Sequence, residues 1–93
     1  MAATPESKVK AAVKDYLKAR GIWYTMPMGT GFGVGGVPDF LCCKGGQFIG
    51  IETKAPGKRG NTSVLQKAQL TAISQAGGIA LVIDDVSQLE GIV

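Results

Sequence analysis

The chain has 93 residues, of which 45% are hydrophobic and 18% are charged. These proportions fit one small packed domain over residues 1–93 and argue against an intrinsically disordered protein. The absence of histidine excludes His-based acid–base and nucleophilic catalysis, together with zinc sites that need a histidine ligand. The net charge of +3 favours a polyanionic partner, although only weakly.

The hydropathy pattern contains no apolar run of about 18 residues, so we expect no membrane-spanning helix. The N-terminal stretch "MAATPESKVK" lacks the apolar segment of a secretory signal, and we therefore expect a cytoplasmic protein. At this length the ratio of surface to volume is unfavourable, so we also expect self-association.

The first predicted element is a helix that begins at Thr4-Pro5-Glu6, with Thr4 as the N-cap and Pro5 in the first turn. Apolar residues then recur at helical spacing as far as Leu17, and Gly21 ends the segment. Glu6 lies in line with the apolar stripe. Its carboxylate either complements the helix dipole or points inward at a site, and the sequence leaves both interpretations open.

A short strand is predicted at "IWYTMP", followed by the glycine-rich stretch "MGTGFGVGGV". This stretch is not a P-loop, because it lacks the Gly-Lys-Ser/Thr ending and runs into Val37-Pro38 instead of a helix. It is not a dinucleotide fingerprint either, since no helix pattern follows. We interpret it as a rim that lets backbone approach a ligand closely.

The remaining elements are two strands, "PDFLCC" and "QFIGIETK", a loop "APGKRGNTS", a helix from about residue 64 to residue 76, an apolar strand "IALVI" and a final short helix or turn. Asn61, Thr62 or Ser63 is expected to cap the second helix. The near-continuous apolar run of "IALVI" is typical of a strand that is covered on both faces. The order α-β-β-β-α-β predicts an α/β fold with a mixed sheet and flanking helices.

Two cysteines, Cys42 and Cys43, are adjacent in one of these strands. Neighbouring strand residues point to opposite faces, so the pair is poorly placed for a mutual disulfide or a shared metal. We interpret both as small buried hydrophobic residues.

The Gly45-Gly46 pair predicts a two-residue hairpin turn of type I′. In that register Asp39 lies directly opposite Glu52, with Cβ atoms about 4.5–5.5 Å apart. Lys54 follows Glu52 by two residues and therefore lies on the same face of the strand.

Two opposed carboxylates repel each other, so this arrangement needs compensation. A hard divalent cation such as Mg²⁺, which binds one or two carboxylates and phosphate oxygens, provides it. An ion pair between Lys54 and one of the acids is the structural alternative. The spacing is compatible with both.

Three features in this order, "GVPDF", "IETK" and a helix that carries Gln66, resemble the PD-(D/E)XK nuclease pattern, with thirteen positions from acid to acid. More narrowly, the chain resembles the virus-type replication-repair nuclease (VRR-NUC) domain in its stand-alone form, found in phages and bacteria. The resemblance extends over nearly the whole chain. It implies a restriction-endonuclease-like fold, the cytoplasm of a bacterial or phage-infected cell, and Mg²⁺- or Mn²⁺-dependent hydrolysis of DNA that leaves 5′-phosphate ends. No small-molecule organic cofactor is implied.

Carried over by position, the resemblance makes Asp39 and Glu52 the principal metal ligands, assisted by the backbone carbonyl of Thr53. Lys54 takes the lysine position of the motif. We favour an electrostatic role for Lys54, because a general base would need a strongly depressed pKa.

Two further residues match the pattern through their helices. Glu6 matches the first-helix acid, which contacts the metal directly or through water. Gln66 matches a glutamine that orients water or phosphate, with Gln69 as a second candidate one turn later. Like the other roles carried over, these two follow from the resemblance and are not fixed by the spacing.

The basic side chains near the motif are candidate phosphate contacts. Lys58 and Arg59, in the loop after "IETK", are the leading candidates, followed by Lys67 and Lys44. Each of them is equally compatible with an ordinary solvated surface charge. Phosphate contacts would position DNA without reading its sequence.

The leading hypothesis is therefore a metal-dependent, structure-selective DNA endonuclease, and the resemblance implies a homodimer that acts on branched DNA such as four-way (Holliday) junctions. A general or restriction-like DNA nuclease is the alternative within the enzymes. A nuclease-fold protein that binds nucleic acid without cutting, and a small structural module with an ion cluster, are alternatives from other classes.

Overall fold

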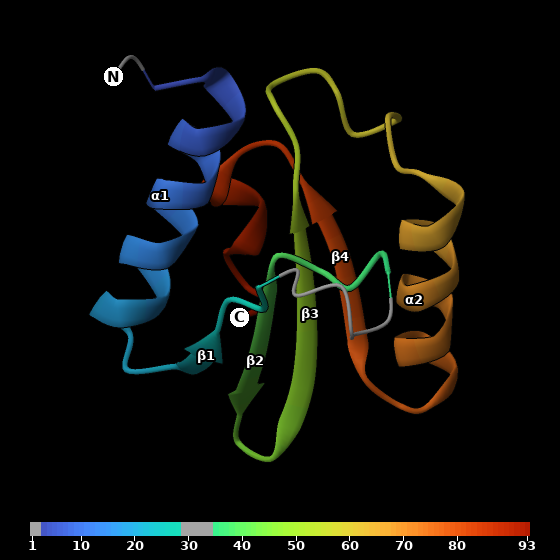
Figure 1. Cartoon of the computed structure of the whole chain (residues 1–93). Helices are drawn as coiled ribbons and strands as arrows, with labels where there is room; N and C mark the ends of the chain where they lie inside the picture. The colour runs from blue at the N-terminus through green and yellow to red at the C-terminus, as the bar shows by residue number, and fades with distance from the viewer. Residues whose placement is uncertain (1–2, 29–34) are drawn as a thin grey trace.

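The computed structural model describes residues 3–28 and 35–93 (Figure 1). Along the chain it has α1 (Pro5–Ala19), β1 (Trp23–Thr25), β2 (Phe40–Lys44), β3 (Gln47–Thr53), α2 (Val64–Gln75), β4 (Ile79–Ile83) and a 3₁₀ helix, η1 (Val86–Leu89). This confirms the predicted α/β order. None of the helices in these ranges is long and apolar enough to cross a membrane.

Both long helices begin at capping residues of the predicted type. The hydroxyl of Thr4 accepts a hydrogen bond of 3.1 Å from the backbone N–H of Ser7. At the second helix Ser63 is the cap, and its side chain and that of Gln66 form a reciprocal capping box. α1 is followed by Gly21, whose φ of 65° lies in the left-handed region that favours glycine.

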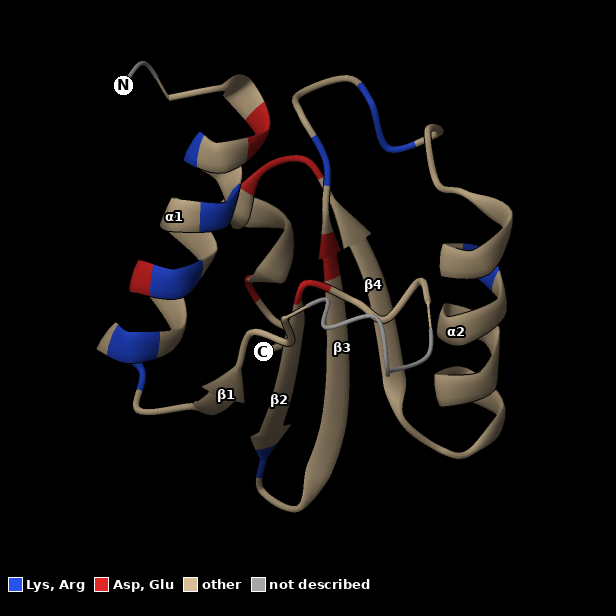
Figure 2. Cartoon of the chain, in the orientation of Figure 1, with Lys and Arg blue, Asp and Glu red and all other residues tan. Residues whose placement is uncertain are grey.

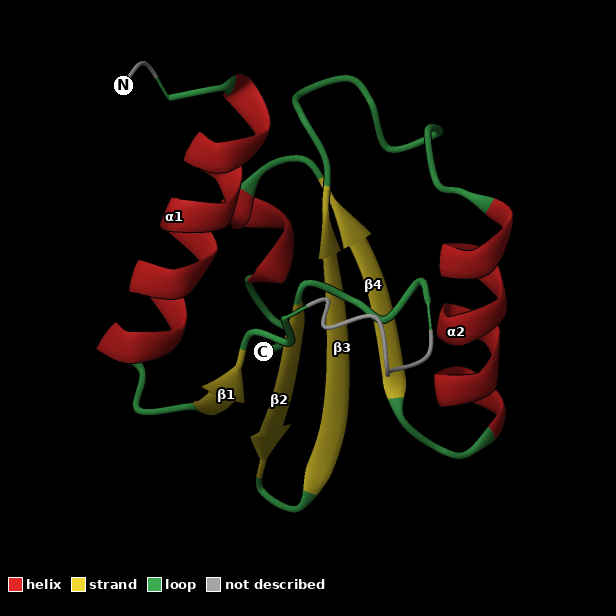
Figure 3. Ribbon diagram, in the orientation of Figure 1, coloured by secondary structure: helices red, strands yellow, loops and turns green. Residues whose placement is uncertain are grey.

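The four strands form one mixed sheet in the order β1-β2-β3-β4, in which the first three are antiparallel neighbours and β4 runs parallel to β3 (Figure 3). Gly45 and Gly46 have φ values of 56° and 80°, as a type I′ turn requires. The ladder runs from the pair Lys44–Gln47 to the pair Phe40–Ile51, which confirms the predicted register.

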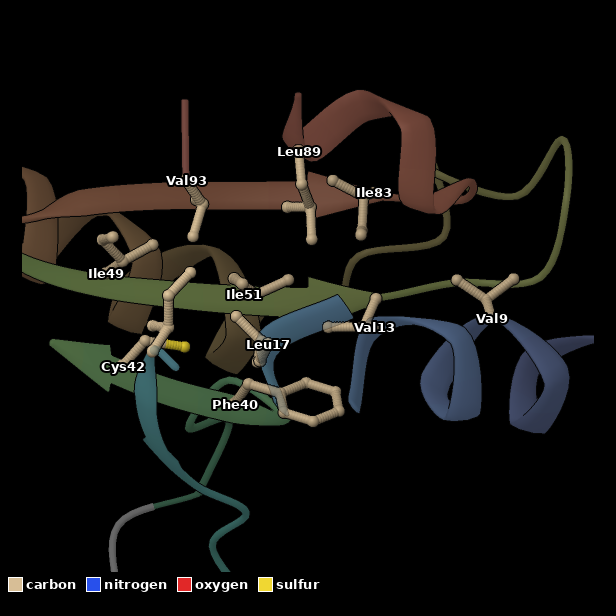
Figure 4. Packing of buried hydrophobic residues seen from close by; sticks show 11 residues of the cluster. Val9, Val13, Leu17, Phe40, Cys42, Ile49, Ile51, Ile83, Leu89 and Val93 are labelled. Atoms are coloured by element: carbon tan, nitrogen blue, oxygen red, sulfur yellow. The ribbon is translucent and has the colours of Figure 1, made fainter. Parts of the chain in front are cut away.

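One face of the sheet packs against α1 and η1 and forms the apolar core (Figure 4). α1 contributes Val9, Val13 and Leu17 to this core. The buried apolar residues that meet them are Ile22, Phe40, Cys42, Ile49, Ile51, Ile83, Leu89 and Val93.

The opposite face carries α2, which packs mainly against β4. None of the residues of α2 is fully buried. A close contact brings α2 to the hairpin: a Cβ on Gly50 would lie 2.9 Å from Cδ1 of Ile73 and 3.2 Å from Cγ of Pro38. Because Gly50 has no side chain, the buried Pro38 can lie over β3 immediately before the chain enters β2.

The two cysteines differ in their surroundings, and both are free thiols. Cys42 is fully buried in the core, as predicted, whereas the prediction of burial is wrong for Cys43, which is exposed. The reason is geometric. Cys43 points to the face that carries α2, and that helix covers β4 more than β2.

Most of the glycine-rich stretch, residues 29–34, lies outside the described residues, so its role as a rim stays a prediction. At its described end, Gly36 has a φ of 82° and lies directly against the first turn of α2. A Cβ at this position would come within 2.4 Å of the backbone carbon of Leu65 and 2.7 Å of the nitrogen of Gln66.

Candidate active site

Two acidic side chains meet where β2 begins and β3 ends. The register of the hairpin, continued by one residue beyond Phe40–Ile51, places Asp39 opposite Glu52. Figure 2 shows acidic residues gathered at this end of the two strands. Glu52 is only 2% exposed, so water does little to stabilise a charge on its carboxylate.

The two carboxyl groups have opposite pKa shifts. Burial, together with the charge of Asp39, raises the pKa of Glu52 to about 7. Burial acts in the same direction on Asp39. The pKa of Asp39 nevertheless lies below its usual value, because hydrogen bonds from the Thr53 hydroxyl (2.7 Å) and backbone N–H (3.0 Å) to Oδ2, a hydrogen bond with Glu52 and the charge of Lys10 together outweigh burial. At neutral pH Asp39 is therefore ionised, while Glu52 is close to its midpoint.

The motif lysine reaches across to the second helix. Lys54 Nζ donates a hydrogen bond of 3.0 Å to Oε1 of Gln66, which also accepts one of 2.9 Å from the backbone N–H of Ser63. In the described part of the chain, Gln66 is thus the glutamine that contacts Lys54, and Gln69 makes no such contact. The capping box of α2 holds the amide that orients the ammonium group.

A second lysine, Lys10 of α1, lies at the site and was not among the predicted residues. Its Nζ is 3.7 Å from Oδ1 of Asp39. The sequence does contain a signal for it, because Lys10 follows Glu6 by four residues and so shares its side of the helix. It is half-buried, whereas Lys8, Lys14 and Lys18 are exposed.

Glu6 does not join the two acids. Within residues 3–28 and 35–93, no three carboxylate, cysteine or histidine side chains come close enough to hold a metal together. Glu6 instead lines a hollow of about 290 Å³ with Lys54, Ala55, Lys58 and Asn61. Its predicted contact with a metal through water stays a prediction.

The comparisons with known proteins bear on the fold. Neither a family model nor a curated protein sequence matches the chain. A solved structure titled "VRR_NUC domain" superposes with a TM-score of 0.72 at 24% sequence identity, over 95% of this chain and 92% of the other. The chain has the VRR_NUC fold. This confirms the fold that the motif residues implied.

In this VRR_NUC fold the first acid, Asp39, follows the buried Pro38, and Glu52 sits one residue before the end of β3. Lys54 lies just past that end, where its backbone N–H donates to the carbonyl of Ile83 on β4. These residues therefore lie on the central strand pair, and the backbone of Lys54 is held by β4.

The loop after the motif is fixed at its middle by Asp84. The backbone N–H of Gly57 donates a 2.8 Å hydrogen bond to Oδ2 of Asp84, and Nε of Arg59 lies 3.6 Å from Oδ1. The hydrogen bond from Gly57 is the largest cause of the lowered pKa of Asp84. Arg59 thus has an acidic partner, whereas Lys58 lines the hollow beside Lys54. Asp84 was not among the predicted residues.

The two remaining basic candidates lie apart from the acids. Lys67 is exposed in the first turn of α2. Lys44 flanks the hairpin turn, at the end of β2 opposite to Asp39. Any phosphate that Lys44 contacts is therefore distant from the bond that a site at Asp39 would cleave, and both contacts stay predictions.

The donor set of the site fits a hard divalent cation. Asp39 and Glu52 offer carboxylate oxygens, and the carbonyl of Thr53 opens to the same strand edge as its N–H, which faces Asp39. The buried Glu52 lies next to an ionised acid, an arrangement that a dication relieves. The alternative ion pair is not formed, since the ion pairs among the described residues involve Lys10 and Arg59, not Lys54.

Proposed function

We propose that residues 1–93 form a nuclease domain that hydrolyses DNA phosphodiester bonds with Mg²⁺ or Mn²⁺. The observation that carries this proposal is the buried Glu52 facing an ionised Asp39, with the Lys54 ammonium group on the same strand end. The VRR_NUC fold supports it, because a domain of that name has the same architecture over 95% of this chain.

Asp39, Glu52 and the backbone carbonyl of Thr53 would hold the cation. When bound, it polarises a phosphoryl oxygen and lowers the pKa of water. Residues of the protein hold these ligands in position. Thr53 fixes Oδ2 of Asp39 by two hydrogen bonds, so the rotamer of this ligand is set before a cation arrives.

Lys54 and Gln66 act on the phosphate side of the reaction. The hydrogen bond of 3.0 Å from Lys54 Nζ to Gln66 directs the ammonium group, which then offsets negative charge that develops on the phosphoryl oxygens. A compact ammonium suits this role, since it is a point charge with several donors. Glu6, across the hollow from Lys54, would order water near the cation.

The substrate that we propose is branched DNA, such as a four-way (Holliday) junction, cut by a homodimer to leave 5′-phosphate ends. Two sites related by a twofold axis suit two opposed strands of a symmetric junction. Phosphate contacts from Lys58 and Arg59, and then from Lys67 and Lys44, would hold the backbone without reading bases. The compartment would be the cytoplasm of a bacterial or phage-infected cell.

The test is a cleavage panel of end-labelled four-way junctions, flaps, forks, duplex and single strands, each with Mg²⁺, Mn²⁺ or chelator. We expect metal-dependent cutting, fastest on the branched substrates. Lys54→Ala should still bind the junction but cut it about 10²–10³-fold more slowly, because the charge of the transition state loses its partner. Lys14→Ala, an exposed lysine of α1, is the matched control and should cut normally.

Each other outcome of the panel points to a different function. Equal cutting by wild type and Lys54→Ala would contradict the assignment of the site. Cutting of plain duplex as fast as junctions would indicate a general or restriction-like nuclease. Junction binding without cutting in any metal would indicate a nuclease-fold protein that only binds nucleic acid.

A further inference from the structure

The two oxygens of the Asp39 carboxylate have different partners. Oδ2 accepts both hydrogen bonds from Thr53, at 2.7 and 3.0 Å. Oδ1 takes neither of these two bonds, and the ammonium of Lys10 lies 3.7 Å from it. The oxygen that Thr53 does not occupy is therefore the one that Lys10 approaches.

Lys10 is set apart from the other lysines of α1 by this contact. Its side chain is 36% exposed and that of Asp39 is 26% exposed, so the pair lies at the rim of the site, half shielded from water. In the part of the chain that the structure describes, it is the cation that forms an ion pair with a motif acid. The charge of Asp39 is thus already compensated before any metal is bound.

A divalent cation and an ammonium group cannot share the same carboxylate oxygen at short range without strong mutual repulsion. The flexible four-carbon stem of lysine allows its charge to move away while the helix stays in place. A displaced ammonium would stay at the rim of the site, where a DNA phosphate that approaches the cation could contact it.

We propose that Lys10 is a positioning residue that competes with the divalent cation for Asp39 Oδ1 and, once displaced, binds a backbone phosphate of the DNA. This rests on the proposed nuclease function and adds a residue outside its motif. The same side chain then lowers metal affinity in the free protein and raises DNA affinity in the metal-loaded one. Metal and DNA consequently favour each other's binding, and the coupling is reciprocal.

The test compares Lys10→Met with Lys14→Met, which removes the same charge from an exposed position one turn along α1. Both substitutions keep a good helix former, and circular dichroism and thermal unfolding verify the fold. Mn²⁺ binding is measured by calorimetry without DNA. Junction binding is measured with and without Mn²⁺ in a Lys54→Ala background, so that the strands remain intact.

We expect Lys10→Met to bind Mn²⁺ about threefold or more tightly than wild type, in line with the loss of a partly exposed ion pair. In the presence of Mn²⁺ it should bind the junction several-fold more weakly. Lys14→Met should change each affinity by a smaller factor, and Lys10→Arg should retain most of the DNA affinity.

Equal effects of Lys10→Met and Lys14→Met would mean that the affinities depend only on the net charge of the protein, and this would overturn the proposal. Weaker Mn²⁺ binding by Lys10→Met would also overturn it, since Lys10 would then order Asp39 for the metal. Unchanged junction binding would exclude the phosphate contact. Failure of the proposed function is distinguishable, because the wild type would then neither bind Mn²⁺ nor cut DNA.

Discussion

The two faces of the sheet each bury a residue of β3, but the two residues have different roles. Ile51 and Glu52 are consecutive residues of β3 with exposed fractions of 0% and 2%. Ile51 points into the apolar core beneath α1, whereas Glu52 points to the other face of β3 and lies opposite Asp39 at the end of the strand pair. The comparison teaches that the apolar core beneath α1 supplies stability, and that this stability allows the next residue of the same strand to take part in an unfavourable pair of acids.

The helices reflect the same division. α1 has three buried apolar residues, and α2 has none. What α2 contributes instead is Gln66, which binds Lys54, and Ile73, which fits over Gly50 beside Pro38. A helix with modest packing can serve this purpose because its first turn is fixed by a capping box.

The largest effect on stability is expected when a core leucine of α1 is replaced by alanine. The same substitution at a leucine of α2 provides the comparison. Leu17→Ala removes a fully buried side chain of α1 and should lower the free energy of unfolding by about 3 kcal/mol. Leu70→Ala, at a half-buried position of α2, should cost about 1 kcal/mol. Urea denaturation measures both. Equal losses in the free energy of unfolding would show that the two faces of the sheet do not differ in this way.

The pH dependence of stability tests the acidic pair. The pKa of Glu52 is about 7 in the folded protein, above its value of 4.5 in a model peptide, so the folded state binds this proton more tightly. The contribution of Glu52 to stability is therefore greatest below pH 4.5 and is lost as the pH rises through 7.

Glu52→Gln should remove this loss. Relative to wild type, it should gain about 3 kcal/mol of unfolding free energy at pH 8, and the gain should vanish near pH 4.5. Glu90→Gln removes a carboxylate from an exposed position and serves as the control. A difference between Glu52→Gln and wild type that does not vary with pH would show that the acids are not held together in a dry site.

The smallest effect is expected at the outer surface of α2. Val64 is 83% exposed, and Val64→Ala should change the free energy of unfolding by less than about 0.5 kcal/mol. Thermal unfolding measures it against Val13→Ala, a fully buried position of α1. A large loss at Val64 would mean that this surface is covered, for example by a second copy of the chain.

The hairpin was predictable from sequence because its determinants are local. Gly45 and Gly46 dictate the turn, the turn dictates the register, and strand alternation places Asp39 opposite Glu52. The helix starts at Thr4 and Ser63 follow capping rules that also depend on a few neighbouring residues.

The parts that sequence reasoning missed depend on packing between distant segments. The contact of Lys10 with Asp39 depends on the angle at which α1 crosses the sheet. The sequence also does not give the conformation of a flexible lysine side chain, and so it does not locate the ammonium group. Asp84 lies 27 residues from Gly57, and only the parallel pairing of β4 with β3 brings its carboxylate to the loop. The exposure of Cys43 depends equally on where α2 lies.

Gly36 ties the start of α2 to the segment that leads into the first motif acid. Its Cα rests against the main chain of Leu65 and Gln66, where even one methyl group would collide. A bulkier residue would tilt the opening turn of the helix and carry the amide of Gln66 out of reach of Lys54. The direction of the Lys54 ammonium group thus depends on Gly36, a residue that has no side chain.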